Sequence, residues 1–74
     1  MTFTSGQRVV WLYRPRGHRQ QRSMVDAEIV QFGQLRTRIR IRTAGGAVLL
    51  RWVHPKNVRP KAPDEPDYPY PELR

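Results

Sequence analysis

The sequence predicts an all-β domain of five short strands, arranged as a closed or nearly closed barrel. The clearest pattern lies at residues 35–43, where leucine, threonine or isoleucine alternates with arginine at every second position. A period of two is the period of a strand, because successive side chains leave a pleated backbone on opposite faces. The 74 residues include no cysteine, so a small core must hold the fold without a disulfide. A compact barrel with few exposed strand edges suits such a chain.

The first strand is expected at residues 8–13, which are rich in β-formers. Both of its faces carry apolar side chains. The strand is therefore either covered on both sides or offers an exposed apolar contact, to which Val10 and Leu12 would belong. A loop is expected at residues 14–23, because a proline and a glycine punctuate it and nothing apolar anchors it.

The next elements, in chain order, are a second strand at 24–31, a short turn at 32–34, the arginine-rich strand at 35–43, a tight turn at 44–46 and a fourth strand at 47–53. Alternation directs Asp26 and Glu28 outward from the second strand. In the third strand it directs one face into the core, formed by Leu35, Thr37, Ile39, Ile41 and Thr43. The β-branched residues of that strand favour the extended conformation.

Residues 54–57 contain a proline that breaks the sheet, and they suffice for one turn of 3₁₀ helix. A short fifth strand then occupies residues 58–60. Residues 61–74 hold four prolines and four acids with little to bury, which predicts a disordered, acidic, Pro-rich tail. Alternatively, this tail docks on an aromatic groove or folds back on its own barrel as an acidic strap that competes with the ligand. The domain organisation is therefore an N-terminal extension at 1–5, the barrel at 6–60 and the tail at 61–74.

The chain has no apolar run near the roughly 20 residues that span a membrane. Its first residues lack the charged-then-apolar pattern of a secretory signal. The absence of cysteine fits a reducing compartment. We therefore expect a cytoplasmic protein with no membrane partner.

Charge is distributed unevenly along the chain. Residues 1–60 carry twelve of the fourteen basic residues against two acids, whereas residues 61–74 carry two basic residues against four acids. Eleven of the twelve basic residues in the first part are arginines. Arginine is always charged, is weakly hydrated and forks onto phosphate oxygens, so this balance favours a polyanionic partner.

Three stretches resemble parts of known small barrels. The GQRV stretch at 6–9 is similar to the opening of Tudor and KOW-type barrels, and the AEIV stretch at 27–30 is similar to their second strand. In residues 51–59, one valine closes the fourth strand and another opens the fifth across the 3₁₀ turn, which is similar to their ending. Over about residues 6–60 the chain thus resembles the SH3-like small barrels, a fold that carries many unrelated functions.

This resemblance implies two different ligands. KOW-type barrels bind RNA, whereas Tudor-type barrels bind methylated peptides through an aromatic cage that usually includes an acid. Here the aromatic residues are spread out, and Asp26 and Glu28 stand among arginines. A positive barrel of this kind is a poor trap for a methylated cation. The loop at 14–23 is longer than the compact KOW turn.

The candidate phosphate-binding residues are the arginines of the third strand, those of the loop and one from the fourth strand: Arg14, Arg16, Arg19, Arg22, Arg36, Arg38, Arg40, Arg42 and Arg51. Two interpretations remain open for the third strand. Its arginines either bind a polyanion or form a solvated outer face, partly paired with Asp26 and Glu28. Two acids cannot neutralise four arginines, which favours the polyanion.

Tyr13 and Trp52 are candidates for stacking on bases, whereas Trp11 is expected in the core because a small barrel needs large residues inside. His18 and His54 have no acidic neighbour at ligand spacing, so no metal site is expected. We find no phosphate-binding glycine loop and no catalytic carboxylate pair. From the sequence we therefore expect that the chain is not an enzyme and binds no cofactor.

Two functions follow from these observations. The first is a non-catalytic module that binds DNA or RNA through phosphate contacts. The alternative is a protein-interaction barrel, in which the same arginines meet an acidic partner surface or Val10, Leu12 and Leu49 form a docking face. We expect a monomer or a weak homo-oligomer.

Overall fold

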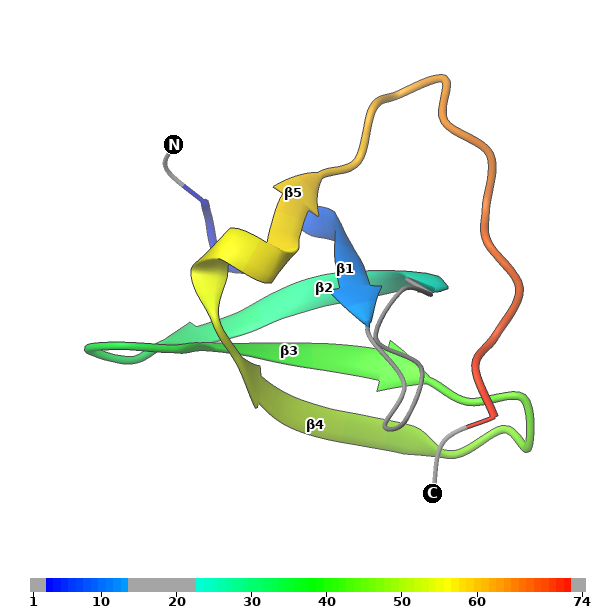
Figure 1. The fold of residues 1–74 in the computed structure, drawn as a ribbon, viewed down its shortest axis with the longest axis horizontal. Helices are drawn as coiled ribbons and strands as arrows, with labels where there is room; N and C mark the ends of the chain where they lie inside the picture. Colours follow the sequence, from blue (N-terminus) through cyan, green and yellow to red (C-terminus); the bar gives the residue numbers. More distant parts are fainter. Residues whose placement is uncertain (1–2, 14–22, 73–74) are drawn as a thin grey trace.

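The structure, a computed structural model, describes residues 3–13 and 23–72. Its elements, in chain order, are β1 (Arg8–Tyr13), β2 (Ser23–Phe32), β3 (Thr37–Arg42), β4 (Val48–Val53), the 3₁₀ turn η1 (Pro55–Asn57) and β5 (Val58–Pro60) (Figure 1). All strand pairs are antiparallel, and the sheet has the order β4-β3-β2-β1-β5. The predicted all-β class, the five strands and the 3₁₀ turn before the last strand are confirmed.

Strand β2 joins the two halves of the sheet. Its first half, from Ser23 to Glu28, pairs with β1, and its second half, from Glu28 to Phe32, pairs with β3. A register shift between Ile29 and Gln31 marks a bulge at the point where the second pairing is established. Bulges bend a strand and increase its twist, so the two halves of the sheet meet at an angle on β2.

The sheet is not closed into a barrel. Strands β4 and β5 form its two edges, and among the described residues no ladder joins them. The prediction of a closed or nearly closed barrel is therefore corrected to an open five-stranded sheet, which is compatible with a small barrel-like fold. The physical reason is the length of β5, which has three residues and pairs only with β1.

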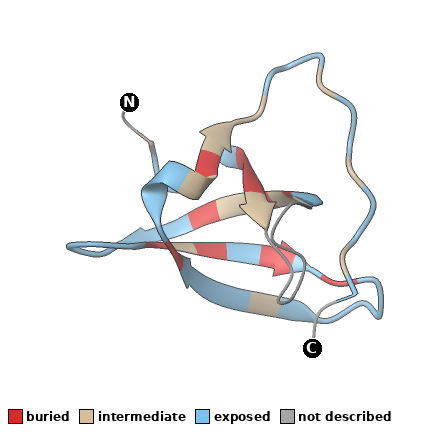
Figure 2. Ribbon diagram, viewed as in Figure 1, coloured by how far each residue is buried: buried red, intermediate tan, exposed pale blue. Residues whose placement is uncertain are grey.

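The core lies on the inward face of β1, β2 and β3 (Figure 2). Every second residue is buried from Val25 to Ile29 of β2 and from Thr37 to Ile41 of β3, as the period of two predicts, whereas β1 buries residues 9–11 in a row. The buried cluster consists of Val9, Trp11, Val25, Ala27, Ile29, Ile39, Ile41, Val53 and Val58. Trp11 belongs to this cluster, as predicted.

Leu35 does not belong to the core. It is 83% exposed, and β3 begins only at Thr37. The backbone N–H of Gly33 donates to the carbonyl oxygen of Arg36 at 2.8 Å. This bond closes a turn that contains Leu35, so the prediction that the third strand begins at Leu35 and buries it is wrong.

The C-terminal segment, residues 61–72, runs back along the sheet instead of leaving it (Figure 1). Near its beginning, Lys61 donates to Asp26 on β2 at 2.7 Å, and the N–H of Tyr68 donates to the other Asp26 oxygen at 2.8 Å. Near its end, the carbonyl oxygen of Pro71 accepts from Ala44 N–H at 2.8 Å. The prediction of a disordered tail is thus replaced, for residues 61–72, by the alternative of a segment that folds back.

This segment explains why β1 is apolar on both faces. Val10 is fully buried although it points away from the core cluster. It lies in register with Asp26 on one side and Arg59 on the other, and both of these residues bind the C-terminal segment. The segment therefore covers the outer face of β1, and Val10 is not available as a docking residue.

None of the helical segments in residues 3–13 and 23–72 is long and apolar enough to cross a bilayer.

Candidate functional site

The arginines of β3 point outward in a row. Because Thr37, Ile39 and Ile41 are buried, Arg38 and Arg42 must emerge on the opposite face together with Arg40. Arg36 precedes the strand and is exposed in the turn. We call Arg36, Arg38, Arg40 and Arg42 the arginine row.

Only one member of the arginine row has a carboxylate partner among the described residues. Arg40 donates to Glu28, which lies opposite it on β2. No carboxylate of residues 3–13 and 23–72 lies within the 4.0 Å of an ion pair from Arg36, Arg38 or Arg42. The expected pairing with β2 is thus limited to Glu28, since Asp26 binds Lys61 instead.

Arg38 stacks on an aromatic ring instead of pairing with an acid. Its guanidinium carbon lies 5.7 Å from the centroid of the Trp52 ring, directly across from it on β4. Its Nε atom is buried and has no hydrogen-bond acceptor within the part of the chain that is described. The stack holds this guanidinium in place while leaving its charge unneutralised.

Gly33 makes room for that ring. A Cβ atom at this position would lie 2.9 Å from Trp52 Cζ3 and 2.9 Å from the carbonyl oxygen of Arg36. Any larger residue would force the turn and the indole apart. The turn between β2 and β3 therefore fixes both Arg36 and Trp52 beside Arg38.

Beside the arginine row lies a second row of exposed apolar side chains from β4. In register, Arg42 faces Val48, Arg40 faces Leu50 and Arg38 faces Trp52. The three β4 residues are 54%, 45% and 45% exposed, in that order. This row was not among the predicted site residues as a set, although the alternation within residues 47–53 carries the signal for it.

Arg51 does not join the arginine row. It lies in register with Ile39 on β3, and Ile39 faces the core, so Arg51 leaves β4 on the other face. The other predicted members, Arg14, Arg16, Arg19 and Arg22, lie outside the described residues. Of the predicted docking face, Val10 is buried, while Leu12 and Leu49 are half-buried.

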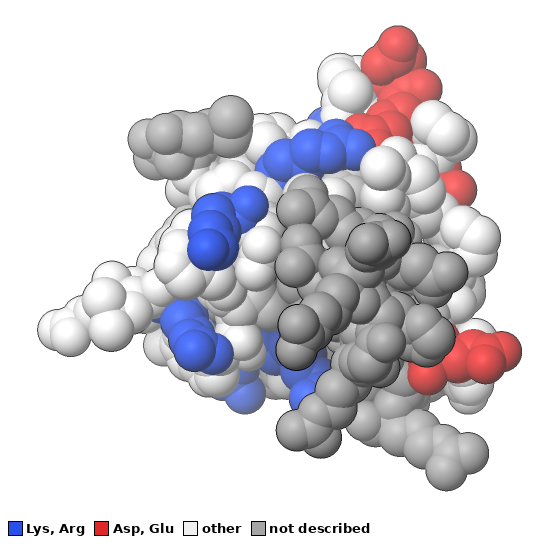
Figure 3. Space-filling model, viewed as in Figure 1, with Lys and Arg blue, Asp and Glu red and all other residues white. Residues whose placement is uncertain are grey.

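The acids of the C-terminal segment neutralise a different group of cations. Glu65 binds Arg59 at 2.6 Å, while Asp67 binds Lys61 at 2.6 Å and Arg8 at 3.4 Å. Figure 3 shows acidic side chains along the right-hand side of the view, where one basic group lies beside them at the top, whereas the other lysine and arginine side chains in view lie over the left and lower parts. The segment therefore leaves the charge of the arginine row in place.

These ion pairs shift the pKa values of the groups involved. The hydrogen bond from Arg59, helped by one from the Tyr68 hydroxyl, lowers the pKa of Glu65 from 4.5 to about 2. The hydrogen bond from Lys61 likewise lowers the pKa of Asp67. Bonds to Asp26 and Asp67 raise the pKa of Lys61. All these shifts favour the charged forms that hold the segment on the sheet.

The ion pair of Glu65 predicts a loss of stability in acid. A carboxyl group whose pKa is lower in the folded state stabilises the fold above its unfolded pKa, and this contribution disappears as pH falls through the folded pKa. We expect the urea concentration at the midpoint of unfolding to decrease as the pH is lowered from about 4.5 to about 2. Glu65→Gln should flatten this decline.

The control for this experiment is Asp64→Asn. Asp64 is exposed and makes none of the ion pairs found in the described segments, so its variant should follow the wild-type pH curve. An unchanged pH dependence in Glu65→Gln would show that this ion pair does not stabilise the fold.

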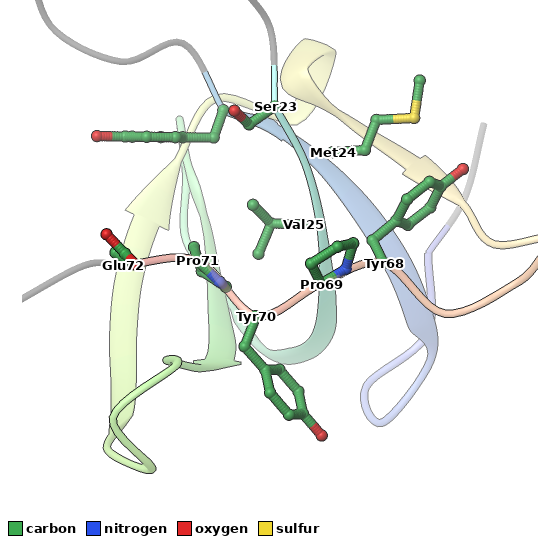
Figure 4. A pocket seen from close by; sticks show the side chains of 9 residues that line it. Ser23, Met24, Val25, Tyr68, Pro69, Tyr70, Pro71 and Glu72 are labelled. Carbon is green, nitrogen blue, oxygen red and sulfur yellow. The ribbon is translucent and has the colours of Figure 1, made fainter.

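Three hollows on the surface of the described residues differ in their lining. One of about 610 Å³ lies between the start of β2 and the C-terminal segment (Figure 4). It is lined by apolar and tyrosine side chains, by Ser23 and by Glu72, with no basic residue. Another, of about 460 Å³, contains Asp26 and Glu28 beside Arg40 and Arg42. The first of these two hollows has no basic residue, and the second contains two carboxylates.

The remaining hollow, of about 730 Å³, lies where β1 and β4 end and η1 begins. Its lining includes Trp11, Tyr13 and Trp52 together with Arg36 and Lys56, and no carboxylate. It is the only one of the three that is both aromatic and basic. In residues 3–13 and 23–72 no cluster of three histidine, cysteine, aspartate or glutamate side chains could hold a metal ion.

We compared the chain with protein-family models, with curated proteins and with solved structures. None of the three comparisons gave a match. The structure supports a small antiparallel sheet of five strands with one 3₁₀ turn. The features of this sheet that bear on function are the arginine row and its surroundings.

Proposed function

We propose that this chain is a non-catalytic nucleic-acid-binding module, and that its fold is a variant of the SH3-like small barrels of the KOW kind. The observation that carries the proposal is the charge of the arginine row. Three of its four guanidinium groups have no carboxylate partner among the described residues, although the same chain brings acids onto Arg8, Arg59 and Lys61.

The spacing of the row suits a phosphate backbone. Outward-facing residues on one strand are about 6.5–7 Å apart, since each residue advances the strand by 3.2–3.4 Å. Phosphates of an extended strand repeat on a similar scale, and guanidinium groups fork onto phosphate oxygens. Binding of this kind neutralises phosphates and releases condensed counterions, so it is largely independent of sequence.

A salt titration tests this proposal. If about five phosphates are contacted, the logarithm of the affinity should fall with the logarithm of salt concentration at a slope of about −3.5 on single strands and −4.5 on duplex. The measurement is fluorescence anisotropy of labelled DNA and RNA with the full chain between 50 and 400 mM salt. Absence of binding at low salt, or a flat slope, would contradict the proposal.

A second candidate is an adaptor for an acidic protein surface. The apolar row of Val48, Leu50 and Trp52 favours it, because this row is exposed along the open edge of the sheet beside the arginines. An amphipathic acidic partner would cover both rows. Nuclease treatment separates the two candidates: a stoichiometric protein partner that survives it supports the adaptor, whereas loss of the bound material supports the nucleic-acid module.

A further inference from the structure

We propose that the hollow at the end of β1 and β4 accepts one unstacked base of a single-stranded nucleic acid, with the adjoining phosphates on Arg36 and Lys56. This inference rests on the proposed function and makes it more specific, because it assigns single strands, in preference to duplex, as the ligand. It also gives Trp52 and Tyr13 a role that phosphate contacts do not supply.

The size of the hollow fits this role. Its volume is about 730 Å³, within the range of roughly 300–1,000 Å³ that is usual for sites that enclose a small organic group. A nucleobase is a flat group that needs an aromatic wall and an open side for its sugar. Trp52 is 45% exposed and lines the hollow, so part of its indole surface is available there.

The lining has the chemistry of a nucleotide site. Trp11 and Tyr13 form one aromatic pair, with ring centroids 4.8 Å apart, and Trp52 adds a third ring from β4. The cations Arg36 and Lys56 lie in the same lining. The base of a nucleotide presents a π-face to the aromatic rings, and the adjoining phosphates need cations. One nucleotide therefore uses both the rings and the two cations of this lining.

His54 adds a hydrogen-bond donor to this lining. It is the N-cap of η1, and its Nδ1 atom accepts from the Lys56 N–H at 3.2 Å. In the neutral imidazole this bond assigns the proton to Nε2. Nε2 is therefore a donor for an acceptor atom of a base or a phosphate, and the same bond anchors the backbone of Lys56.

The hollow is continuous with the arginine row. Trp52 lines the hollow and at the same time stacks with Arg38, the second arginine of the row. A strand whose phosphates follow the row therefore reaches the hollow at Trp52. In a duplex the bases are paired and stacked inside the helix, so they cannot enter such a site without unpairing.

The test compares Trp52→Ala with the wild-type chain on a 12-nucleotide thymidine strand and on a duplex of the same length. We expect the variant to bind the single strand about 5- to 150-fold more weakly, as for the loss of one stacked base. Affinity for the duplex should change by less than about two-fold. The salt slope should stay unchanged, because the substitution removes the ring beside Arg38 but not the charge of Arg38, and stacking itself releases no counterions.

Two further variants keep the outcome interpretable. Leu50→Ala removes a side chain of equal exposure (45%) from the same face of β4 but outside this hollow, so it should bind like the wild type. Trp52→Phe retains an aromatic face and should recover part of the affinity. Urea midpoints establish that all three variants are folded.

Different results would contradict the base site and the phosphate-binding module. Equal losses on single strand and duplex, or no loss on either, with the salt slope intact would overturn the base site and leave the phosphate-binding module standing. A wild-type chain without salt-dependent binding would overturn the module itself.

Discussion

Ile39→Ala is expected to lower the free energy of unfolding by about 2–5 kcal/mol, the range for deleting a large aliphatic side chain from a core. Ile39 is fully buried in β3, between β2 and β4. A chain of this length has a total stability of roughly 4–11 kcal/mol. The substitution should therefore remove a large part of the stability, or all of it. Urea unfolding followed by tryptophan fluorescence measures the effect.

The control is Leu35→Ala, four residues earlier in the same alternating stretch. Leu35 is 83% exposed, so its removal should change stability by no more than about 0.5 kcal/mol. Ile39→Val, expected to cost about 0.5–1.5 kcal/mol, gives a graded value if the alanine variant does not fold. Similar losses for Leu35→Ala and Ile39→Ala would contradict the start of β3 at Thr37.

The triple substitution Arg36→Ser, Arg38→Ser and Arg42→Ser should nearly abolish binding to nucleic acid. Each phosphate contact on a single strand contributes about 0.7 to the salt slope, so three lost contacts should flatten it by about 2. At 0.1 M salt this corresponds to roughly a 100-fold loss of affinity. The loss should be alike for all sequences, because phosphate contacts do not read bases.

The matched control is Arg51→Ser, tested beside the single variant Arg42→Ser. Each removes one arginine from the β3–β4 half of the sheet, but Arg51 leaves the sheet on the face opposite to the arginine row. Arg42→Ser should weaken binding more than Arg51→Ser. Equal effects would show that total charge, and not this face, governs binding.

The class of the fold could be predicted because its signals are local. The alternation at Thr37, Ile39 and Ile41 depends only on backbone geometry, and the structure buries all three. The 3₁₀ turn followed from Pro55, since proline has a fixed φ and no N–H. Leu35 was misplaced because a hydrophobic residue at the right period cannot reveal that a turn ends just before Thr37.

The candidate site could be predicted only in part. That arginines line one face of β3 followed from the alternation. The position of Arg51 was ambiguous, because β4 is apolar on both faces and alternation does not distinguish them. The hollow lined by Tyr13, Trp52 and Lys56 joins residues from different ends of the chain, so no local pattern could indicate it.

By itself, the sequence determined that this protein is a small, strongly basic sheet with arginines projecting from its third strand, since side-chain alternation and composition are properties of neighbouring residues. Only the tertiary structure decided which cations have a carboxylate beside them. Residues 61–72 return to place Glu65 and Asp67 on Arg59, Lys61 and Arg8, none of which belongs to the arginine row. Ion pairing depends on distances in space between residues remote in sequence, and only the folded chain sets those distances.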